Sequence, residues 1–354
     1  MYRKNVSKII GLGLAALIMV GCAAPSVETS ILMPAKQPNM TNAKRLGIAP
    51  LSGDRDNRYT SKLQAFIGNI QVKGAPYFTL VDIDRDTIMR EQRLSDTALF
   101  DAKTAVELGR LVAADTILSG AVKPPKYKKS RSVEERKRCV KGEKSEYSDT
   151  YIKCEKYDTY VVICATQAMR FGMTLRATNV ATGTVAFIQD YADEARHHYC
   201  IDNGVERNKD ALADEAIAKL LQTVRMDIAP YPVRFTIQFL DYDAKSGLGS
   251  KSVFFEANAQ AKAAFESGLK LAEKNQAGLA CEQFRKAAGL FNGSPAIFHN
   301  LGVCAELDGN FDKAIAFYEQ SSLVAPTPID VTLNALARAK RNKSTSAAAN
   351  AQLR

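Results

Sequence analysis

The first 22 residues of the chain constrain its cellular location and the start of its folded part more than any other stretch. Arg3, Lys4 and Lys8 form a basic head, and an apolar run follows at residues 9–20. A transmembrane helix needs about 20 apolar residues, so this run is too short to span a bilayer. It has the length of a signal-peptide core, and it therefore predicts export from the cytoplasm.

The residues that close this segment, Gly21 and Cys22, resemble the lipobox of bacterial lipoproteins. In that family the cysteine is acylated and becomes the first residue of the mature protein. The resemblance implies a signal peptide at 1–21, a covalent lipid on Cys22 and no other cofactor. Ala23, rather than Asp, follows the cysteine, which implies the outer membrane, with the folded part facing the periplasm. An ordinary secretory signal with an unrelated cysteine is the alternative, and it also predicts export.

Length and charge set the next limits. The chain has 354 residues, of which 46% are hydrophobic, and this suits about two domains with sizeable cores. No second apolar run of membrane-spanning length follows, so lipid alone would attach the protein. The formal net charge of +10 is concentrated, because residues 123–156 hold 12 Lys and Arg against 6 Asp and Glu. In an exported protein this segment suits anionic headgroups, lipopolysaccharide or peptidoglycan carboxylates rather than nucleic acid, or it is a solvated loop.

Four of the 7 cysteines surround this basic segment. In an oxidising periplasm such a group favours two disulfides, although four cysteines allow three pairings. We favour Cys139 with Cys154, which closes a charged hairpin, and Cys164 with Cys200. Zinc is the alternative, but no CxxC spacing supports it.

The rest of the chain divides into segments of different texture. Residues 22–43 contain three prolines and no periodicity, which predicts a flexible tether. Over 44–240, β-rich runs alternate with helical periods, which predicts an α/β (α+β) domain with a sheet covered by helices and a basic insertion at 123–158. Residues 241–253 predict a linker, and the low-complexity residues 342–354 predict a disordered tail.

Several motifs occur in a fixed order and spacing along this domain. They are RLGIAPL at 45–51, FTLVD at 78–82, REQ at 90–92, LVAADTILSG at 111–120 and LRATNVATG at 175–183. They resemble the periplasmic domain of the CsgG family of curli secretion lipoproteins, which implies that α/β fold and a periplasmic setting. The same unit occurs in LpoB, a lipoprotein activator of a peptidoglycan synthase, and in flagellar and TolB-like relatives.

The chain departs from that family where the family has membrane-spanning hairpins. The first equivalent segment, 124–158, carries charges at successive positions, in 128–131 and 134–138, and these cannot all face a lumen. A Lys or Arg on the lipid side near the midplane costs about 2–4 kcal/mol. The second equivalent segment, 193–208, is short and polar. We therefore expect the family's fold and compartment without its pore.

A repeat of 34 residues marks the C-terminal region, 254–341, where Gly268 aligns with Gly302. The pattern resembles the tetratricopeptide repeat, which implies an all-α domain of two helix pairs plus a capping helix, with a groove that docks protein partners. A structural appendage is the alternative. Cys281 and Cys304 fall on helices expected to pack together, and they fit a free thiol pair or a disulfide equally well. The signature residues are Gly268, Ala280, Phe284, Leu301, Gly302, Ala314, Tyr318 and Pro326.

The residues that carry chemistry do not converge on a catalytic pattern. Of the 3 histidines, His197 and His198 are adjacent on a polar stretch, where exposure is commoner than metal binding, and His299 falls within a repeat helix. The chain has no GxSxG or HExxH motif, and residues 247–252 lack the spacing of a phosphate loop. We expect neither enzymatic activity nor a metal site.

Together these patterns predict a non-enzymatic outer-membrane lipoprotein that faces the periplasm. It would act as a scaffold or accessory for secretion or envelope assembly, and it would dock periplasmic or outer-membrane proteins through its repeats. Self-association into a homo-oligomer is compatible with this prediction. Two alternatives stay open, an oligomeric secretion pore of the CsgG type and an LpoB-like activator of a peptidoglycan synthase.

Overall fold

The computed structural model describes residues 25–40, 43–83, 102–145, 150–241 and 258–353. These described residues divide into two compact units, one from within 31–233 and 344–353 and the other from within 25–30 and 234–343. The described residues contain eight helices and a five-stranded mixed sheet, so the fold class is α+β, as the sequence predicts.

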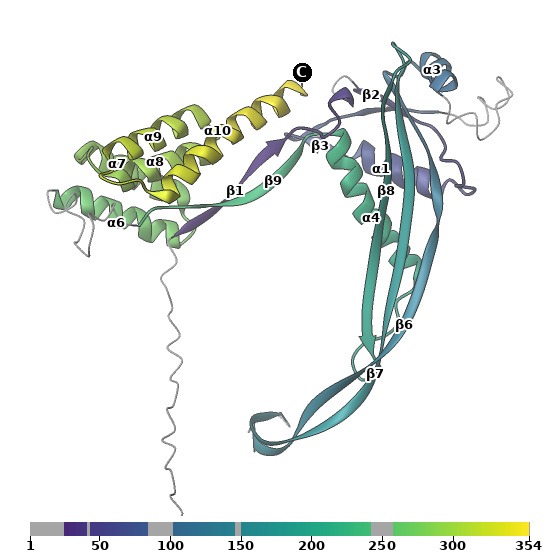
Figure 1. Cartoon of the computed structure of the whole chain (residues 1–354), viewed down its shortest axis with the longest axis horizontal. Helices are drawn as coiled ribbons and strands as arrows, with labels where there is room; N and C mark the ends of the chain where they lie inside the picture. The colour runs from purple at the N-terminus through teal and green to yellow at the C-terminus, as the bar shows by residue number, and fades with distance from the viewer. Residues whose placement is uncertain (1–24, 41–42, 84–101, 146–149, 242–257, 354) are drawn as a thin grey trace, which may run out of the picture. The chain divides into compact units, whose positions relative to one another are not determined.

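A five-stranded sheet is the centre of the first unit (Figure 1). Its order is β5-β2-β6-β7-β8, in which β2 runs parallel to both β5 and β6, while β6, β7 and β8 form an antiparallel meander. The strands are β2 (Arg45–Ile48), β5 (Thr79–Val81), β6 (Thr116–Lys144), β7 (Tyr151–Asn179) and β8 (Val185–Cys200). A small hairpin joins β3 (Gln71–Val72) to β4 (Ala75–Pro76), and β1 (Ser26–Met33) pairs with β9 (Tyr231–Gln238).

Helices cover both faces of the sheet near β2. Neighbouring side chains on a strand point to opposite faces, and Leu118 accordingly packs in the core with α1 (Arg58–Gly68) and α4 (Lys209–Ile228), while Ile117 packs with α3 (Ala102–Leu111). The α4 helix begins at Asn208, whose side chain accepts a hydrogen bond from the Asp210 N–H (2.8 Å).

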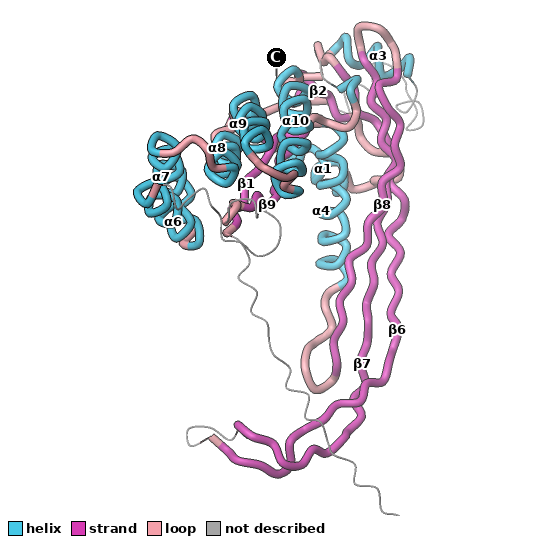
Figure 2. Tube along the Cα trace, turned by 60° about the vertical axis from the view of Figure 1, so that its left-hand side comes forward, coloured by secondary structure: helices cyan, strands magenta, loops and turns pink. Residues whose placement is uncertain are grey.

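Strands β6 and β7 are each 29 residues long, about five times the usual strand length. Pairing between β7 and β8 ends at the Cys164–Cys200 pair, so beyond it β6 and β7 pair only with each other (Figure 2). We call residues 133–144 and 151–163 the arm. The segment that the sequence treats as a basic insertion is therefore β structure.

The second unit is mainly helical. Its first two helix pairs repeat a close contact: a Cβ at Gly268 would lie 2.6 Å from the Phe284 ring, and one at Gly302 would lie 2.5 Å from the Tyr318 ring. A disulfide joins Cys281 to Cys304 across neighbouring helices. The helices are α6 (Ala259–Glu273), α7 (Ala277–Leu290), α8 (Pro295–Leu307), α9 (Phe311–Val324) and α10 (Asp330–Ala351).

Two segments differ from the sequence prediction. The tether predicted at 22–43 contains β1 and a 3-10 turn at Pro38–Met40, with Ile31 and Met40 buried, because alternating residues of β1 pack inward against apolar side chains. The tail predicted to be disordered at 342–354 continues α10, since its alanines favour helix. Gln352 then holds this end, accepting hydrogen bonds from the Ala35 N–H (2.7 Å) and, on its carbonyl, from Lys44 Nζ (2.7 Å).

The predicted signal peptide with Cys22, and the linker predicted at 241–253 apart from its first residue, lie outside the described residues. No helix in the described part of the chain has both the length and the hydropathy that crossing a membrane requires.

Candidate functional site

Val162 is the one buried residue among the described residues of the arm, so the arm depends on cross-links as well as on burial. A disulfide joins Cys139 to Cys154, and Cys164 and Cys200 form a second disulfide at the base of the arm. These are the pairs that the sequence favours. Ion pairs such as Lys141–Glu155 (3.2 Å) add about 0.2–1 kcal/mol each. A two-stranded hairpin alone is marginally stable in water, so the Cys139–Cys154 disulfide helps to keep the two strands of the arm paired, while Cys164–Cys200 joins β7 to β8 at its base.

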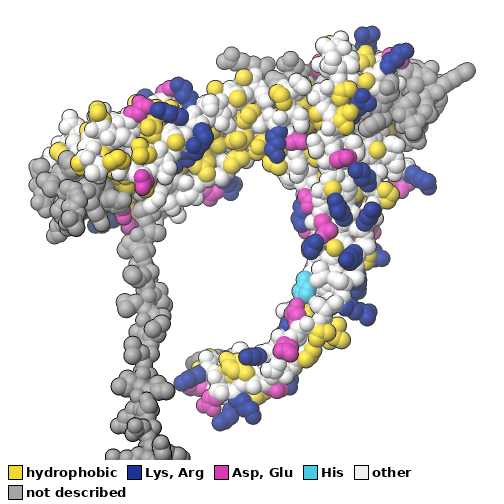
Figure 3. Space-filling model, viewed as in Figure 1, with side chains coloured by type: hydrophobic (Ala, Val, Ile, Leu, Met, Phe, Trp, Pro, Cys, Tyr) yellow, Lys and Arg dark blue, Asp and Glu magenta, His cyan; other side chains and the backbone are white. Residues whose placement is uncertain are grey.

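One face at the base of the arm is apolar and exposed. Val133 lies directly opposite Ile163, and Val161 follows on the same side of β7, while Val162 between them is buried on the other face. The Ile201 N–H donates to the Ile163 carbonyl (3.1 Å) just beyond the end of β8. A cluster of hydrophobic side chains on the arm is visible in Figure 3. We call Val133, Val161, Ile163 and Ile201, with 67%, 61%, 52% and 72% of their surfaces exposed, the apolar patch.

Charged side chains border the apolar patch. On the same face of β6, Arg131 precedes Val133, and Glu135 and Lys137 follow it at alternate positions; Glu135 lies opposite Val161. Among the described residues, neither Arg131 nor Lys137 has an ion-pair partner, so both cations are available to a bound carboxylate.

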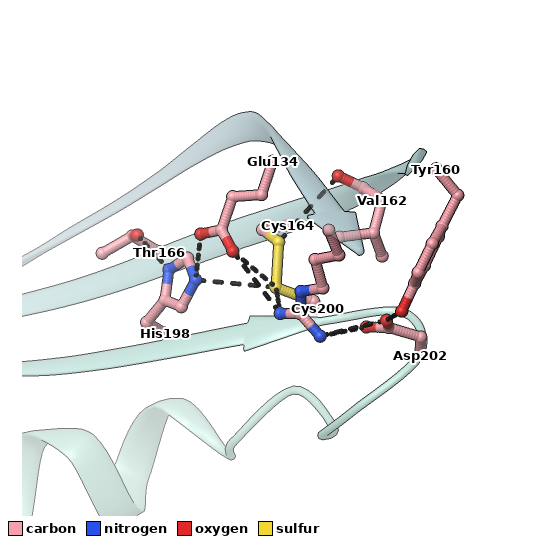
Figure 4. Close-up of polar contacts among 9 residues, drawn as sticks. Glu134, Tyr160, Val162, Cys164, Thr166, His198, Cys200 and Asp202 are labelled. Carbon is pink, nitrogen blue, oxygen red and sulfur yellow. Dashed lines mark hydrogen bonds and ion pairs between the residues drawn. A yellow bond between two sulfur atoms is a disulfide. The ribbon is translucent and has the colours of Figure 1, made fainter. Parts of the chain in front are cut away.

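The opposite face carries a cluster of polar groups around the Cys164–Cys200 disulfide (Figure 4). The His198 Nε2 lies 2.9 Å from Glu134 Oε1, and the His198 Nδ1 lies 3.0 Å from Thr166 Oγ1. The Cys200 Sγ is 3.6 Å from His198 Nε2 and 3.8 Å from Glu134 Oε2. Three adjacent strands therefore direct metal-ligating atoms to one point.

An arginine closes this cluster on the side of the arm tip. Arg136 Nη2 lies 3.0 Å from Cys200 Sγ, and Nη1 donates to both carboxylate oxygens of Asp202 (3.0 Å each). Tyr160 also donates to Asp202 (3.3 Å), which fixes the carboxylate. The guanidinium is thus held with one edge against the disulfide.

The loop after β8 is held in place by Gln167. Its side-chain carbonyl accepts from the Arg207 N–H (2.9 Å), and its amide donates to the Arg207 carbonyl (2.9 Å). Lys129 donates to Glu206 (2.8 Å), and this hydrogen bond lowers the pKa of the Glu206 carboxyl. The same loop therefore positions Ile201 on the apolar patch and Asp202 at the cluster around the disulfide.

In the helical unit, the chain's own residues 237–240 cover α8. The Asn300 side chain accepts from the Leu240 N–H (2.7 Å) and donates to the Leu240 carbonyl (3.0 Å). Phe239 is fully buried, with its ring centroid 5.4 Å from that of Phe284. This arrangement resembles a peptide held by its backbone, with the peptide supplied by the protein itself.

His299, on the same helix, is buried and hydrogen-bonded on both ring nitrogens. Its Nε2 lies 3.1 Å from the Gln238 carbonyl, which only accepts, so Nε2 carries the hydrogen. Its Nδ1 then accepts from Thr332 (2.9 Å). Burial lowers the pKa of His299 to about 4, so the ring is neutral at neutral pH.

The repeat residues chosen from the sequence lie mostly in the helical core rather than on a surface. All but one are buried, because the small residues let two helices approach and the aromatic rings fill the space beside them. Pro326 is the exposed one, just beyond the end of α9. The buried set is Gly268, Ala280, Phe284, Leu301, Gly302, Ala314 and Tyr318.

The sequence reasoning missed the cluster of Glu134, Cys164, His198 and Cys200. One signal was available: His198 and Cys200 alternate on a strand, which puts both side chains on one face. The sequence carries no signal for the strand registers that place Cys164 and Glu134 beside these two residues.

No family model and no curated protein matches the chain. Among solved structures, the LpoB C-terminal domain from Salmonella enterica matches 45% of this chain and 94% of its own length, with 17% identity and a TM-score of 0.24. The PelC dodecamer from Paraburkholderia phytofirmans matches 55% of this chain and 95% of its own length, with 14% identity and a TM-score of 0.23. Both TM-scores are below 0.5, and the CsgG and tetratricopeptide resemblances stay predictions.

Proposed function

We propose that the protein is a non-enzymatic, exported lipoprotein that serves as a scaffold or accessory in envelope assembly or secretion. The observation that carries this proposal is the apolar patch, which is exposed at the base of an arm whose two strands the Cys139–Cys154 disulfide joins. Large apolar groups gathered in one exposed place mark an interaction site more often than they serve the fold.

The three disulfides support an extracytoplasmic setting. Six of the 7 cysteines are paired, and such pairing is rare in proteins that remain in a reducing compartment. The remaining cysteine, Cys22, is the one that the lipobox resemblance assigns to lipid. On this proposal, the protein is anchored at the outer membrane and faces the periplasm.

The partner of the patch is a protein surface with an apolar centre and acidic neighbours. The branched side chains would supply the desolvated centre of such an interface, while Arg131 and Lys137 would orient the partner's carboxylates. Because the charges lie at the rim, they affect the association rate and its salt dependence more than the final affinity.

This proposal moves the docking site away from the repeats. If the helical unit is a tetratricopeptide array, residues 238–240 lie where a partner peptide would bind α8, held by Asn300 and His299. A partner would first have to displace Phe239 from its buried position. Docking on the repeats stays a prediction for the surfaces that this segment leaves open.

Co-purification from intact cells tests the docking site. After crosslinking, the wild-type chain is expected to retain a partner that the double variant Val161→Asp, Ile163→Asp loses. The matched control is Leu323→Asp, which changes a residue of similar exposure (78%) on α9 and should leave the partner bound. If the patch variant keeps the partner and the Leu323 variant loses it, docking occurs on the helical unit and the proposal is wrong.

A further inference from the structure

We propose that Glu134, Cys164, His198 and Cys200 form a zinc site when the Cys164–Cys200 disulfide is reduced. One ligand atom from each residue lies within 4.8 Å of all the others. Glu134 comes from β6, Cys164 from β7, and His198 and Cys200 from β8. Both cysteines are 1% exposed, so the sulfurs lie inside the protein rather than on its surface.

The distances already suit a tetrahedral ion. Zinc binds sulfur at about 2.3 Å and imidazole nitrogen at about 2.0–2.1 Å, which places its ligand atoms about 3.3–3.8 Å apart. The separations of 3.6 Å between Cys200 Sγ and His198 Nε2 and 3.8 Å between Cys200 Sγ and Glu134 Oε2 fall close to this range. The two sulfurs, which are bonded to each other in the structure, must separate, and His198 Nε2 and Glu134 Oε1, now 2.9 Å apart, must move apart by a few tenths of an ångström.

A second observation supports a metal at this point. Histidine ligands usually hold the ring by a hydrogen bond on the nitrogen that does not bind the metal. Thr166 Oγ1 lies 3.0 Å from His198 Nδ1, and this contact directs Nε2 into the cluster. The ring is therefore oriented before any ion arrives.

A cation also lies beside the site. Two thiolates, one carboxylate and a zinc ion sum to one negative charge, and the Arg136 guanidinium beside Cys200 Sγ, which it shares with Asp202, offsets part of it. The same cation favours the thiolate form of Cys200, the form that binds zinc. Asp202, which holds Arg136 with both carboxylate oxygens, keeps this charge in position.

The switch between the two states is a two-electron exchange. A dithiol reductant attacks the Cys164–Cys200 bond through a mixed disulfide, and its second thiol releases the protein as two thiols while the reductant becomes a disulfide. Zinc then binds both sulfurs as thiolates and releases their protons to water. The disulfide links only β7 to β8, whereas zinc would link these strands to β6 as well, directly behind the apolar patch.

Zinc titration of the reduced protein tests the proposal. The full chain carrying Cys22→Ser is reduced with a phosphine and titrated against a chromogenic chelator, with cobalt as a spectroscopic probe. We expect a zinc Kd of about 1 nM or tighter, in the range of structural sites, and a cobalt spectrum with thiolate charge-transfer bands. The oxidised protein should lack this site.

Variants separate this site from the other thiols of the reduced chain. The variant Cys164→Ser, Cys200→Ser should lose the site, whereas the matched control Cys139→Ser, Cys154→Ser should keep it. Thr166→Val, which leaves every ligand in place, should weaken zinc binding about 10–100-fold. If the Cys164→Ser, Cys200→Ser chain binds zinc as tightly as the parent chain, or if Thr166→Val has no effect, the proposal is overturned.

Discussion

At the scale of single residues, His299 shows how a polar group is accommodated within the helical core. Both ring nitrogens have hydrogen-bond partners, Thr332 and the Gln238 carbonyl. The neutral ring therefore makes all of its hydrogen bonds within the protein, although none of its surface is exposed to solvent. The charged ring would place a proton on Nδ1, which now accepts from Thr332. Protonation therefore removes a hydrogen bond and also buries a charge.

This predicts a loss of stability in acid. The pKa of His299 is about 4 in the folded protein, below the value of about 6.5 in an unfolded chain, so the unfolded state takes up the proton first. Stability should fall as the pH decreases from 6.5 to 4, by about 3 kcal/mol in total. Urea unfolding of the wild-type chain and of His299→Gln at several pH values measures the difference. Identical pH dependence in the two chains would contradict this account.

Among single residues, the disulfides could be predicted from the sequence, whereas the cluster around His198 could not. The two disulfides of the α/β unit follow from four cysteines near one charged hairpin, and the sequence suggests their pairing. The cluster around His198 does not follow, because Glu134 and His198 come from strands that both pair with β7 and not with each other. Such a site depends on two registers that no local pattern records.

At the scale of elements, the helix pairs are held by two contacts between a glycine and an aromatic ring. Gly268 and Phe284 in the first pair correspond to Gly302 and Tyr318 in the second. The Tyr318 hydroxyl also donates to the buried Glu306 (2.8 Å), which Arg338 of α10 holds at 2.7 Å. The ring position is therefore fixed, and the space beside the glycine cannot easily open.

Alanine substitution of two helix glycines tests this packing. In Gly302→Ala the new methyl group would lie 2.5 Å from Tyr318, so we expect a loss of about 1–3 kcal/mol. Gly289 on α7 has nothing within 4 Å of the same position, so Gly289→Ala should stabilise the protein by about 0.5–1 kcal/mol. Denaturant unfolding gives both values, and equal effects of the two changes would argue against the packing described.

Elements were predictable from the sequence where one face is buried and were missed where both faces meet solvent. The helix at Lys209–Ile228 keeps its apolar residues on one side and follows from its period. The sequence predicts a charged hairpin at the arm but not the length of its strands, because charged residues occupy both faces of β6 and conceal the two-residue period. The end of α10 was missed for a different reason: its low complexity suggested disorder, although its alanines favour helix and contacts with distant residues such as Ala35 hold the residues that follow it.

At the scale of the whole molecule, one cysteine is expected to decide where the chain is held. The lipobox resemblance predicts that Cys22 carries the only anchor, and Cys22→Ser should therefore move the protein from the membrane fraction to the soluble periplasmic fraction. Membrane fractionation with an immunoblot measures this, and Cys281→Ser is the control that should stay with the membrane. Membrane association that survives Cys22→Ser would show another mode of attachment.

The central claim is that a protein partner docks on the apolar patch. The most direct measurement places a photo-crosslinking amino acid at Val161, at Ile163 and at Leu323, one position at a time, in intact cells. The account predicts an adduct of defined mass from both patch positions that weakens in the Arg131→Glu, Lys137→Glu background, and none from Leu323. An adduct of twice the chain's mass would identify the partner as a second copy. Adducts from Leu323 alone, or patch adducts indifferent to the charge reversal, would contradict it.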